Sequence, residues 1–172
     1  MSGESRLGAD LLAALRARGW TVAVAESVTG GMVTAALVDV AGASLGLRGG
    51  VVAYATDLKA SVLGVDPALL AARGAVHPDV AGEMAAGVRA LLGSDVGLAT
   101  TGVAGPDPQD GHPPGTVHVA VATAGGVRVE SMRLPGDRGA VRTAARDRVL
   151  RLALDVLADQ GTGGALGALE AV

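Results

Sequence analysis

The stretch from Thr21 to Val40, TVAVAESVTGGMVTAALVDV, determines what the rest of the chain can form. Its first five residues are short, apolar and in part β-branched, which is typical of a buried strand. A polar turn with two glycines follows, and Met32 to Val40 is apolar with helical spacing. This order of strand, glycine-containing turn and helix predicts the first half of a βα unit.

The same signals continue along the chain on both sides of this stretch. We expect further strands at 47–54, 96–103, 116–123 and 127–134, and helices at 7–18, 56–63, 67–73, 78–92 and 138–157. Strands separated by helices, with one hairpin near the end, predict an α/β fold: a three-layer α/β/α sandwich on a mixed, mostly parallel sheet of about five strands. We expect one domain over residues 1–159, and a flexible Gly/Ala tail over 160–172.

The composition excludes several classes of protein. The 172 residues include no Cys, which excludes disulfide frameworks, thiolate metal sites and a cysteine nucleophile. A net charge of -3 and a near absence of aromatic residues argue against nucleic-acid binding. There is no apolar run of about 18 residues, which argues against a membrane span. Met1 to Asp10 lacks the apolar core of a signal peptide, so we expect a cytoplasmic protein.

Polar groups that could carry chemistry follow the predicted strands. In open α/β sheets ligands gather at the carboxyl ends of the strands. That rule selects four segments, which are Glu26–Gly31, Tyr54–Lys59, Thr100–Pro106 and Gly136–Arg142. The three histidines, by contrast, have no spacing that indicates a metal site, so we expect no metal.

Ser27 lies where a strand-to-helix turn can expose its hydroxyl group. Backbone N–H groups at the start of a helix, here near Gly30 and Gly31, can bind a developing oxyanion. The alternative is structural, because Ser and Thr are preferred helix caps and two glycines permit a tight turn. Taken alone, this segment favours the structural interpretation.

Lys59 stands out because the chain otherwise uses arginine for positive charge. Of 14 basic residues, 13 are Arg. Arginine stays protonated, whereas a buried lysine can lose its proton and act as a base. A solvated surface lysine is the alternative, but the composition favours a position where arginine cannot serve. The same argument applies to Tyr54, the only phenol.

Two further segments have weaker signals. Arg138 and Arg142 are one helical turn apart and could hold a phosphate, or they could form a solvated, Asp-paired helix face. Thr100 and Thr101 place two hydroxyls at a strand end, followed by small residues that let a ligand approach the backbone. Each pattern alone is also compatible with a purely structural role.

In combination these segments resemble a known family, the C-terminal domain of the competence/damage-inducible protein CinA. The residues that carry the resemblance run in the family's order from about Leu7 to Leu157, and they are AESVTGG at 25–31, Tyr54 with Lys59, Gly64-Val65, Gly74-Ala75-Val76, TGVAGP at 101–106, Gly115-Thr116-Val117 and Gly136-Asp137-Arg138. The chain departs from the family pattern at Asp107–Pro114, which lacks the usual Gly-Gly after the first proline.

The resemblance implies an α/β/α sandwich and the activity of a stand-alone nicotinamide-nucleotide amidase. That reaction hydrolyses the carboxamide of nicotinamide mononucleotide to nicotinate mononucleotide and ammonia. The family's stand-alone amidases work without a metal or other cofactor and tend to be oligomers, often dimers. We therefore expect a nucleotide substrate, a homodimer, and neither nucleic acid nor membrane as a partner.

The resemblance also implies roles for individual residues. Ser27 matches the nucleophile and Lys59 the base, and an arginine early in the last helix belongs to the site, with Arg142 our first choice and Arg138 the second. The remaining expected substrate and oxyanion positions are Thr29, Gly30, Gly31, Tyr54, Thr101 and Gly102.

The resulting hypothesis is a Ser–Lys acyl-enzyme mechanism in pyridine nucleotide recycling. Neutral Lys59 would accept the Ser27 proton, then protonate the departing ammonia directly or through Thr101 or Tyr54. Two alternatives stay open on the sequence: a nucleotide-binding or regulatory module linked to competence or DNA damage that does not hydrolyse its ligand, and an amidase for another small amide.

Overall fold

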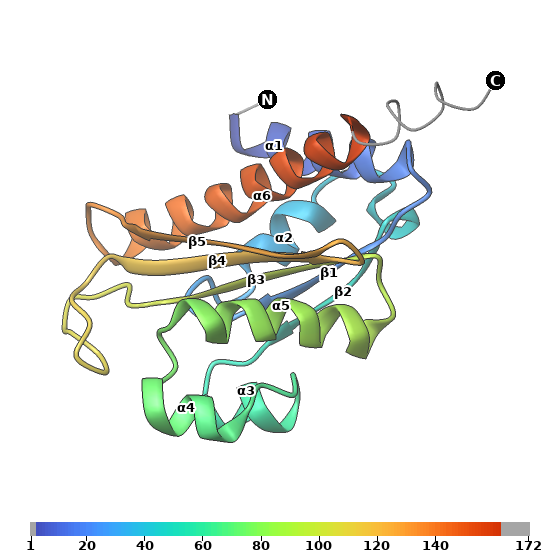
Figure 1. The fold of residues 1–172 in the computed structure, drawn as a ribbon. Coiled ribbons are helices and arrows are strands. Elements are labelled where there is room, and N and C mark those ends of the chain that lie inside the picture. Colours follow the sequence, from blue (N-terminus) through green and yellow to red (C-terminus); the bar gives the residue numbers. More distant parts are fainter. Residues whose placement is uncertain (1–2, 163–172) are drawn as a thin grey trace.

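The structure is a computed structural model that describes residues 3–162 (Figure 1). In chain order its elements are α1 (Gly3–Arg16), β1 (Val22–Glu26), α2 (Met32–Val38), η1 (Ala43–Leu45), β2 (Leu47–Val52), α3 (Thr56–Ser61), α4 (Pro67–Arg73), α5 (Pro78–Leu92), β3 (Val96–Gly102), β4 (Thr116–Thr123), β5 (Gly126–Arg133) and α6 (Arg138–Thr162). Among these residues, no helix is both long and apolar enough to cross a membrane.

The five strands form one mixed sheet in the order β2-β1-β3-β4-β5. β1 is parallel to β2 and β3, β4 is antiparallel to β3, and β5 is antiparallel to β4. Only β4 therefore opposes the common direction. Helices α1, α2 and α6 cover one face, and α5 covers the other with α3 and α4 beyond it (Figure 1). The predicted three-layer α/β sandwich is confirmed.

Strand alternation gives the two faces of the sheet different side chains. Along β3, Val96 and Leu98 pack with the core on the α1/α2/α6 face, and Ala99 packs with the core beneath α5. Gly97 also faces α5, where an added Cβ would lie 2.0 Å from the Ala85 carbonyl oxygen. Only glycine permits that approach. A chain rich in Ala and Gly and without Phe fits so short a distance between helix and sheet.

The connections place a crevice at one edge of the sheet. After β1 the chain crosses through α2 to β2, and then returns through α3, α4 and α5 to β3 on the other side of β1. The strand order thus reverses at β1. In open α/β sheets such a reversal opens a crevice at the carboxyl ends of the strands, where ligands bind.

The observed elements differ from the expected ones mainly at their ends. The second strand stops at Val52, and the short helix Ala43–Leu45 had no sequence signal. The last helix continues past Leu157 to Thr162, so the first residues of the expected tail are helical. The Gln160 side-chain amide donates to Thr123 Oγ1 at 2.8 Å and holds this last turn against β4. The rest of the expected tail, 163–172, lies outside the described residues.

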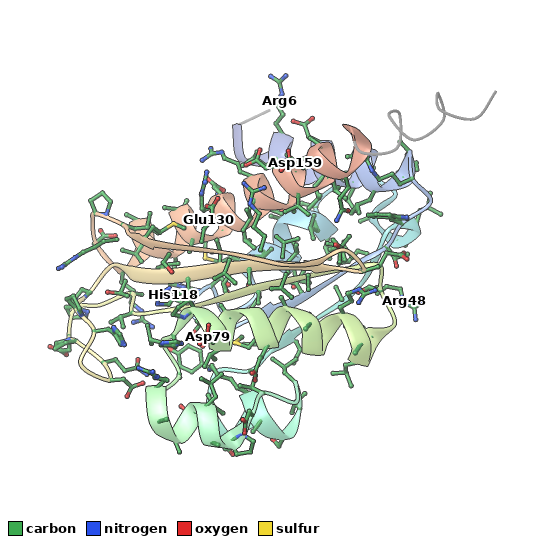
Figure 2. All side chains as sticks on the ribbon, in the orientation of Figure 1. Arg6, Arg48, Asp79, His118, Glu130 and Asp159 are labelled. Carbon is green, nitrogen blue, oxygen red and sulfur yellow. The ribbon has the colours of Figure 1, made fainter. Side chains whose placement is uncertain are left out.

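Two ion pairs join the edge strand β5 to α6. Arg148 Nε lies 2.6 Å from Glu130 Oε2, and Arg128 Nη1 lies 2.8 Å from Asp159 Oδ2. Figure 2 shows Glu130 and Asp159 on the side of the sheet that α6 covers. Both pairs are partly solvated, so their contribution is at most about 1 kcal/mol each.

Candidate active site

A cavity of about 370 Å³ lies at the carboxyl ends of β1 and β3, where the topology predicts a ligand site. It brings together residues from five separate segments of the chain. The lining residues are Ser27, Val28, Tyr54, Lys59, Ala75, Val76, Thr101, Gly102, Val103, Ala104, Gly105, Pro106, Asp107, Pro108, Gln109 and Arg138. Three of the four segments selected from the sequence each contribute at least two residues to the cavity lining, and the fourth contributes Arg138.

Ser27 begins the turn that follows β1. Its backbone N–H donates to the Thr100 carbonyl at 3.0 Å, which extends the β1–β3 pairing by one residue. The next turn needs glycine, because Gly30 and Gly31 have φ of 58° and 101°. Ser27 is only 8% exposed, so its hydroxyl lies in the floor of the cavity rather than at the surface.

Glu26, which sequence analysis did not single out, fixes the shape of this turn. It is fully buried, and its carboxylate accepts from the Thr29 hydroxyl and from the backbone of Gly31 and Val33 at 2.7 to 3.1 Å. The other oxygen accepts from the backbone and hydroxyl of Thr34 at 2.8 and 2.7 Å. A carboxylate at the start of α2 satisfies helix N–H groups and interacts favourably with the helix dipole. The sequence did hold one signal for this role. Gly31 at the start of α2 has no side chain to cap the helix, so another group must accept from the first helix N–H groups.

Lys59 is 1% exposed although it carries the only ammonium group among the side chains. Its Nζ donates to Ser27 Oγ at 3.0 Å and to the Ala53 carbonyl at 2.9 Å, and it lies 3.4 Å from the Tyr54 carbonyl. Burial lowers the pKa of Lys59 from 10.5 to about 8, and the negative charge of Asp110 opposes that shift. At pH 7 about a tenth of Lys59 side chains is therefore neutral, and at pH 8 about half.

The contact between Ser27 and Lys59 is the arrangement that base-assisted nucleophilic attack requires. The distance of 3.0 Å is within hydrogen-bond reach, and the lowered pKa lets the amine accept a proton. Two backbone carbonyls hold the amine in place, so its orientation does not depend on a bound ligand.

Arg138 and Tyr54 stand together at the edge of the cavity. Arg138 Nη2 donates to the Tyr54 hydroxyl at 3.1 Å, and its Nη1 donates to the Gly105 carbonyl at 2.9 Å. The Tyr54 side chain is 61% exposed, so this pair faces solvent and the cavity at once. In that position the guanidinium group of Arg138 can give up its hydrogen bond to the neutral Tyr54 hydroxyl and bind an anionic group of a ligand instead.

Arg142, the first choice from the sequence, is not among the residues that line the cavity. Its Nε donates to the Val28 carbonyl at 3.1 Å and its Nη2 to the Thr29 carbonyl at 2.9 Å. It therefore supports the outer side of the Ser27 turn, and of the two arginines only Arg138 lines the cavity. Both lie on one helix face, and only the packing of α6 decides which one reaches the cavity.

The backbone amides of Gly30 and Gly31, which are the expected oxyanion donors, have partners within the turn. The Gly30 N–H donates to the Ser27 carbonyl at 3.1 Å, and the Gly31 N–H donates to Glu26. Both amides are thus used within the turn, and neither glycine lines the cavity. Thr29 is fully buried with its hydroxyl on Glu26, so it belongs to the support of the turn and not to the ligand surface.

Thr101 and Gly102 line the cavity as expected. The Thr101 hydroxyl donates to the Ala75 carbonyl at 2.7 Å, so its proton already has an acceptor. Gly102 is required by packing, because an added Cβ would lie 2.5 Å from the Thr116 carbonyl oxygen. Thr101 holds the wall of the cavity to the turn before α5, and this contact makes it a poor proton relay for Lys59.

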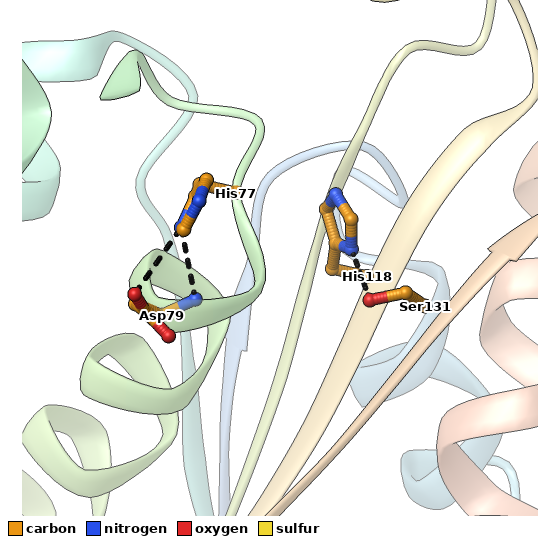
Figure 3. Close-up of polar contacts among 4 residues, drawn as sticks. All are labelled: His77, Asp79, His118 and Ser131. Atoms are coloured by element: carbon orange, nitrogen blue, oxygen red, sulfur yellow. Dashed lines mark hydrogen bonds and ion pairs between the residues drawn. The ribbon is translucent and has the colours of Figure 1, made fainter. Parts of the chain in front are cut away.

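None of the three histidines, all within the described residues, is among those that line the cavity. His77 caps α5, with its Nδ1 accepting from the Asp79 N–H at 3.2 Å, and His118 Nδ1 lies 2.8 Å from Ser131 Oγ (Figure 3). Burial, with His112 and His77 nearby, lowers the pKa of His118. Across the part of the chain that the structure describes, no three His, Asp or Glu side chains are grouped to hold a metal ion.

Comparison with known proteins gives the same result from sequence and from structure. The model of the CinA C-terminal domain matches residues 4–157. A CinA-like protein from Frankia casuarinae is 54% identical over 155 residues, which are 90% of this chain and 36% of that protein. A CinA-like protein from Geobacter sulfurreducens is 46% identical over 142 residues, 82% of this chain and 34% of that protein. The chain thus spans about a third of the length of these curated relatives.

Solved structures of similar size cover most of the chain. A competence-damaged protein (CinA) superfamily protein from Klebsiella pneumoniae superposes with a TM-score of 0.88 at 35% identity, covering 92% of this chain and 99% of that one. The competence/damage inducible protein CihA from Agrobacterium tumefaciens gives a TM-score of 0.85 at 32% identity, covering 90% of this chain and 95% of that one. By sequence and by fold, the chain belongs to the CinA C-terminal domain family.

Proposed function

We propose that this chain is an amidohydrolase that converts nicotinamide mononucleotide to nicotinate mononucleotide and ammonia through an acyl-enzyme on Ser27. The observation that carries the proposal is the buried 3.0 Å contact between Ser27 Oγ and the Nζ of Lys59, whose pKa is lowered to about 8. A purely structural lysine gains nothing from such burial, because the charge loses its hydration.

The reaction begins when neutral Lys59 takes the Ser27 proton as Oγ attacks the carboxamide carbon. The C–O bond forms and the carbonyl oxygen becomes an oxyanion, next to the backbone of Val28 in the cavity lining. Collapse of this intermediate breaks the C–N bond, and the Lys59 ammonium protonates the nitrogen that leaves as ammonia. The Thr101 hydroxyl is bonded to Ala75 and Tyr54 to Arg138, which favours direct transfer from Lys59.

Water completes the reaction. Lys59, neutral again, accepts a proton from the water that attacks the ester carbon, and the ester C–O bond breaks to return the proton to Ser27 Oγ. Arg138 at the cavity edge holds the phosphate of the substrate and so positions the pyridine ring over Ser27. No step requires a metal or another cofactor.

The test is ammonia release at pH 8 from nicotinamide mononucleotide and, in parallel, from free nicotinamide. We expect turnover of the mononucleotide and a KM for free nicotinamide at least about tenfold higher, since a charged hydrogen bond to phosphate contributes roughly 1.5–3 kcal/mol. Lys59→Arg should lose turnover while keeping its fold, because arginine keeps the charge and does not release its proton. Normal turnover by Lys59→Arg would refute the assignment of the base.

The alternative from the sequence, a regulatory module that binds the nucleotide, predicts a different result. Calorimetry would then detect binding of the mononucleotide by the wild type without release of ammonia. Two further expectations accompany the proposal, a homodimer and a cytoplasmic location. Light scattering on the purified chain tests the first, and cell fractionation tests the second.

A further inference from the structure

Strand β5 forms one edge of the sheet, between α6 and α5 (Figure 1). Within residues 3–162 it pairs with β4 on one side and with no strand on the other. Its register with β4 is unbroken from Gly126 to Arg133, and the strand contains no proline. The opposite edge, β2, contains two glycines and has a register shift against β1. A regular edge strand presents N–H and C=O groups that can pair with another chain, and β5 is the more regular edge.

The alternation of hydrogen bonds determines which backbone groups lie on the open side of β5. Leu134 N–H donates to the Gly115 carbonyl at 2.8 Å, so these two residues form a hydrogen-bonded pair. In an antiparallel ladder such pairs alternate with pairs that are not bonded to each other. Every second residue before Leu134 therefore bonds to β4. The N–H and C=O groups of Val127, Val129 and Ser131 point away from β4.

The side chains of β5 differ between the two faces of the sheet. Arg128 and Glu130 each form an ion pair with a residue of α6. Val127 and Val129 lie on the other face, where they line a groove against α5, and Val127 is 50% exposed. A strand added at this edge would therefore meet charged side chains on the α6 face and apolar side chains on the α5 face.

Charge decides how a second copy of β5 would pair with the first. Two copies pair about a two-fold axis, and because the odd-numbered residues bond to each other, the axis passes through one residue. An axis through Arg128 or through Glu130 sets two like charges directly opposite each other, which is destabilising. An axis through Val129 sets Arg128 of each copy opposite Glu130 of the other. That register also gives about six backbone hydrogen bonds, from Val127, Val129 and Ser131 of both copies.

The ion pairs within each copy would join across this axis. Arg128 is paired with Asp159, and Glu130 is paired with Arg148. With the axis at Val129, the order becomes Asp159, Arg128, then Glu130 and Arg148 of the second copy. The charges alternate in sign along this series, and the two-fold axis repeats it. A network of this kind stabilises more than an isolated surface pair does.

We propose that β5 is the interface with a second copy of this chain, paired antiparallel about Val129 so that two five-stranded sheets become one continuous sheet. The complementarity of Arg128 and Glu130 selects the register, and the open N–H and C=O groups supply the hydrogen bonds. This interface does not depend on the amidase activity, and its tests measure association and not turnover.

Charge reversal tests the register. Arg128→Glu and Glu130→Arg each set like charges opposite one another in such a dimer. Each variant alone should raise the dissociation constant of the dimer at least about tenfold in light scattering over a dilution series. An equimolar mixture of the two variants restores opposite charges at both positions and should form a heterodimer. Arg73→Glu, at the exposed end of α4, is the control and should associate like the wild type.

Thermal unfolding of each variant shows whether it is folded, since each reversal also removes an ion pair with α6. Wild-type association that persists unchanged in both folded variants would overturn the proposal. Variants that are monomers alone and stay monomers when mixed would overturn the pairing of Arg128 with Glu130.

Amide hydrogen exchange tests the edge in the wild type without a mutation. The N–H groups of Val127, Val129 and Ser131 are open in a single copy and should be protected in the dimer, and dilution to the monomer should remove that protection. A wild-type dimer in which these amides exchange freely would place its interface elsewhere and refute the proposal. A wild type that stays monomeric at every concentration would likewise refute it, and would leave the edge open to a strand of another protein.

Discussion

Replacement of Lys59 by Met tests whether the buried amine destabilises the folded state. Met has a similar length, fills the same space and does not titrate. The pKa of Lys59 falls from 10.5 to about 8 in the folded chain because of burial. At 1.36 kcal/mol per pKa unit, holding Lys59 protonated at pH 7 destabilises the folded state by about 3 kcal/mol.

The sign of the pH dependence follows from proton binding. Between pH 8 and pH 10.5 the unfolded chain binds the Lys59 proton and the folded chain does not, so the stability of the wild type rises with pH. Met removes this contribution. Between pH 7 and pH 10 the unfolding free energy of the wild type should therefore rise by about 2.5 kcal/mol relative to that of Lys59→Met.

The assay is urea denaturation at the two pH values, followed by the fluorescence of Trp20, the only Trp and a residue packed against the core. Hydrogen bonds lost to Met affect both pH values equally and cancel in this comparison. Arg73→Met, at the exposed end of α4, is the control and should show the same difference at both. A Lys59→Met difference that does not change with pH would refute the lowered pKa.

Three other changes test the supports of the site. Glu26→Gln should destabilise the chain by about 2–3 kcal/mol in urea, because an amide NH2 faces several donors; a loss below about 0.5 kcal/mol would contradict the role given to Glu26. Arg138→Ala should raise KM for the mononucleotide about tenfold or more and leave free nicotinamide little affected, whereas Arg142→Ala should reduce stability and kcat; equal KM effects would remove the distinction. Because the pKa of His118 is lowered in the fold, the unfolded chain binds more protons in acid, so stability should fall below about pH 6.5 and fall less in His118→Gln. Thermal unfolding at pH 7 and pH 5 measures this, and identical losses in both proteins would contradict it.

The fold was predictable because its signals are local. Alternation and glycine placement gave five strands, and Gly93 ends α5 with φ of 60°, where a left-handed residue closes the helix. The helix of residues 43–45 was missed because three residues carry no periodicity. The end of α6 was misplaced because the contact of Gln160 with Thr123 joins distant parts of the chain.

In the candidate site, Ser27 and Lys59 were predictable from the sequence, and the residues that hold them in place were not. Ser27 and Lys59 could be found because one follows β1 and the other is the only lysine in an arginine-rich chain. The choice between Arg138 and Arg142 depends on how α6 lies on the Ser27 turn, which no local pattern encodes. The contacts of Glu26 and Asp110 likewise form between segments that only the folded chain brings together.

Ammonia release from nicotinamide mononucleotide by wild type, Ser27→Ala and Ser61→Ala tests the central claim most directly. Ser61 is the matched control, since it lies exposed on α3 and its hydroxyl donates to the Asp57 carbonyl. The account predicts that wild type and Ser61→Ala release ammonia at similar rates and that Ser27→Ala loses at least about a thousandfold in kcat. Release by Ser27→Ala at the wild-type rate would contradict an acyl-enzyme on Ser27.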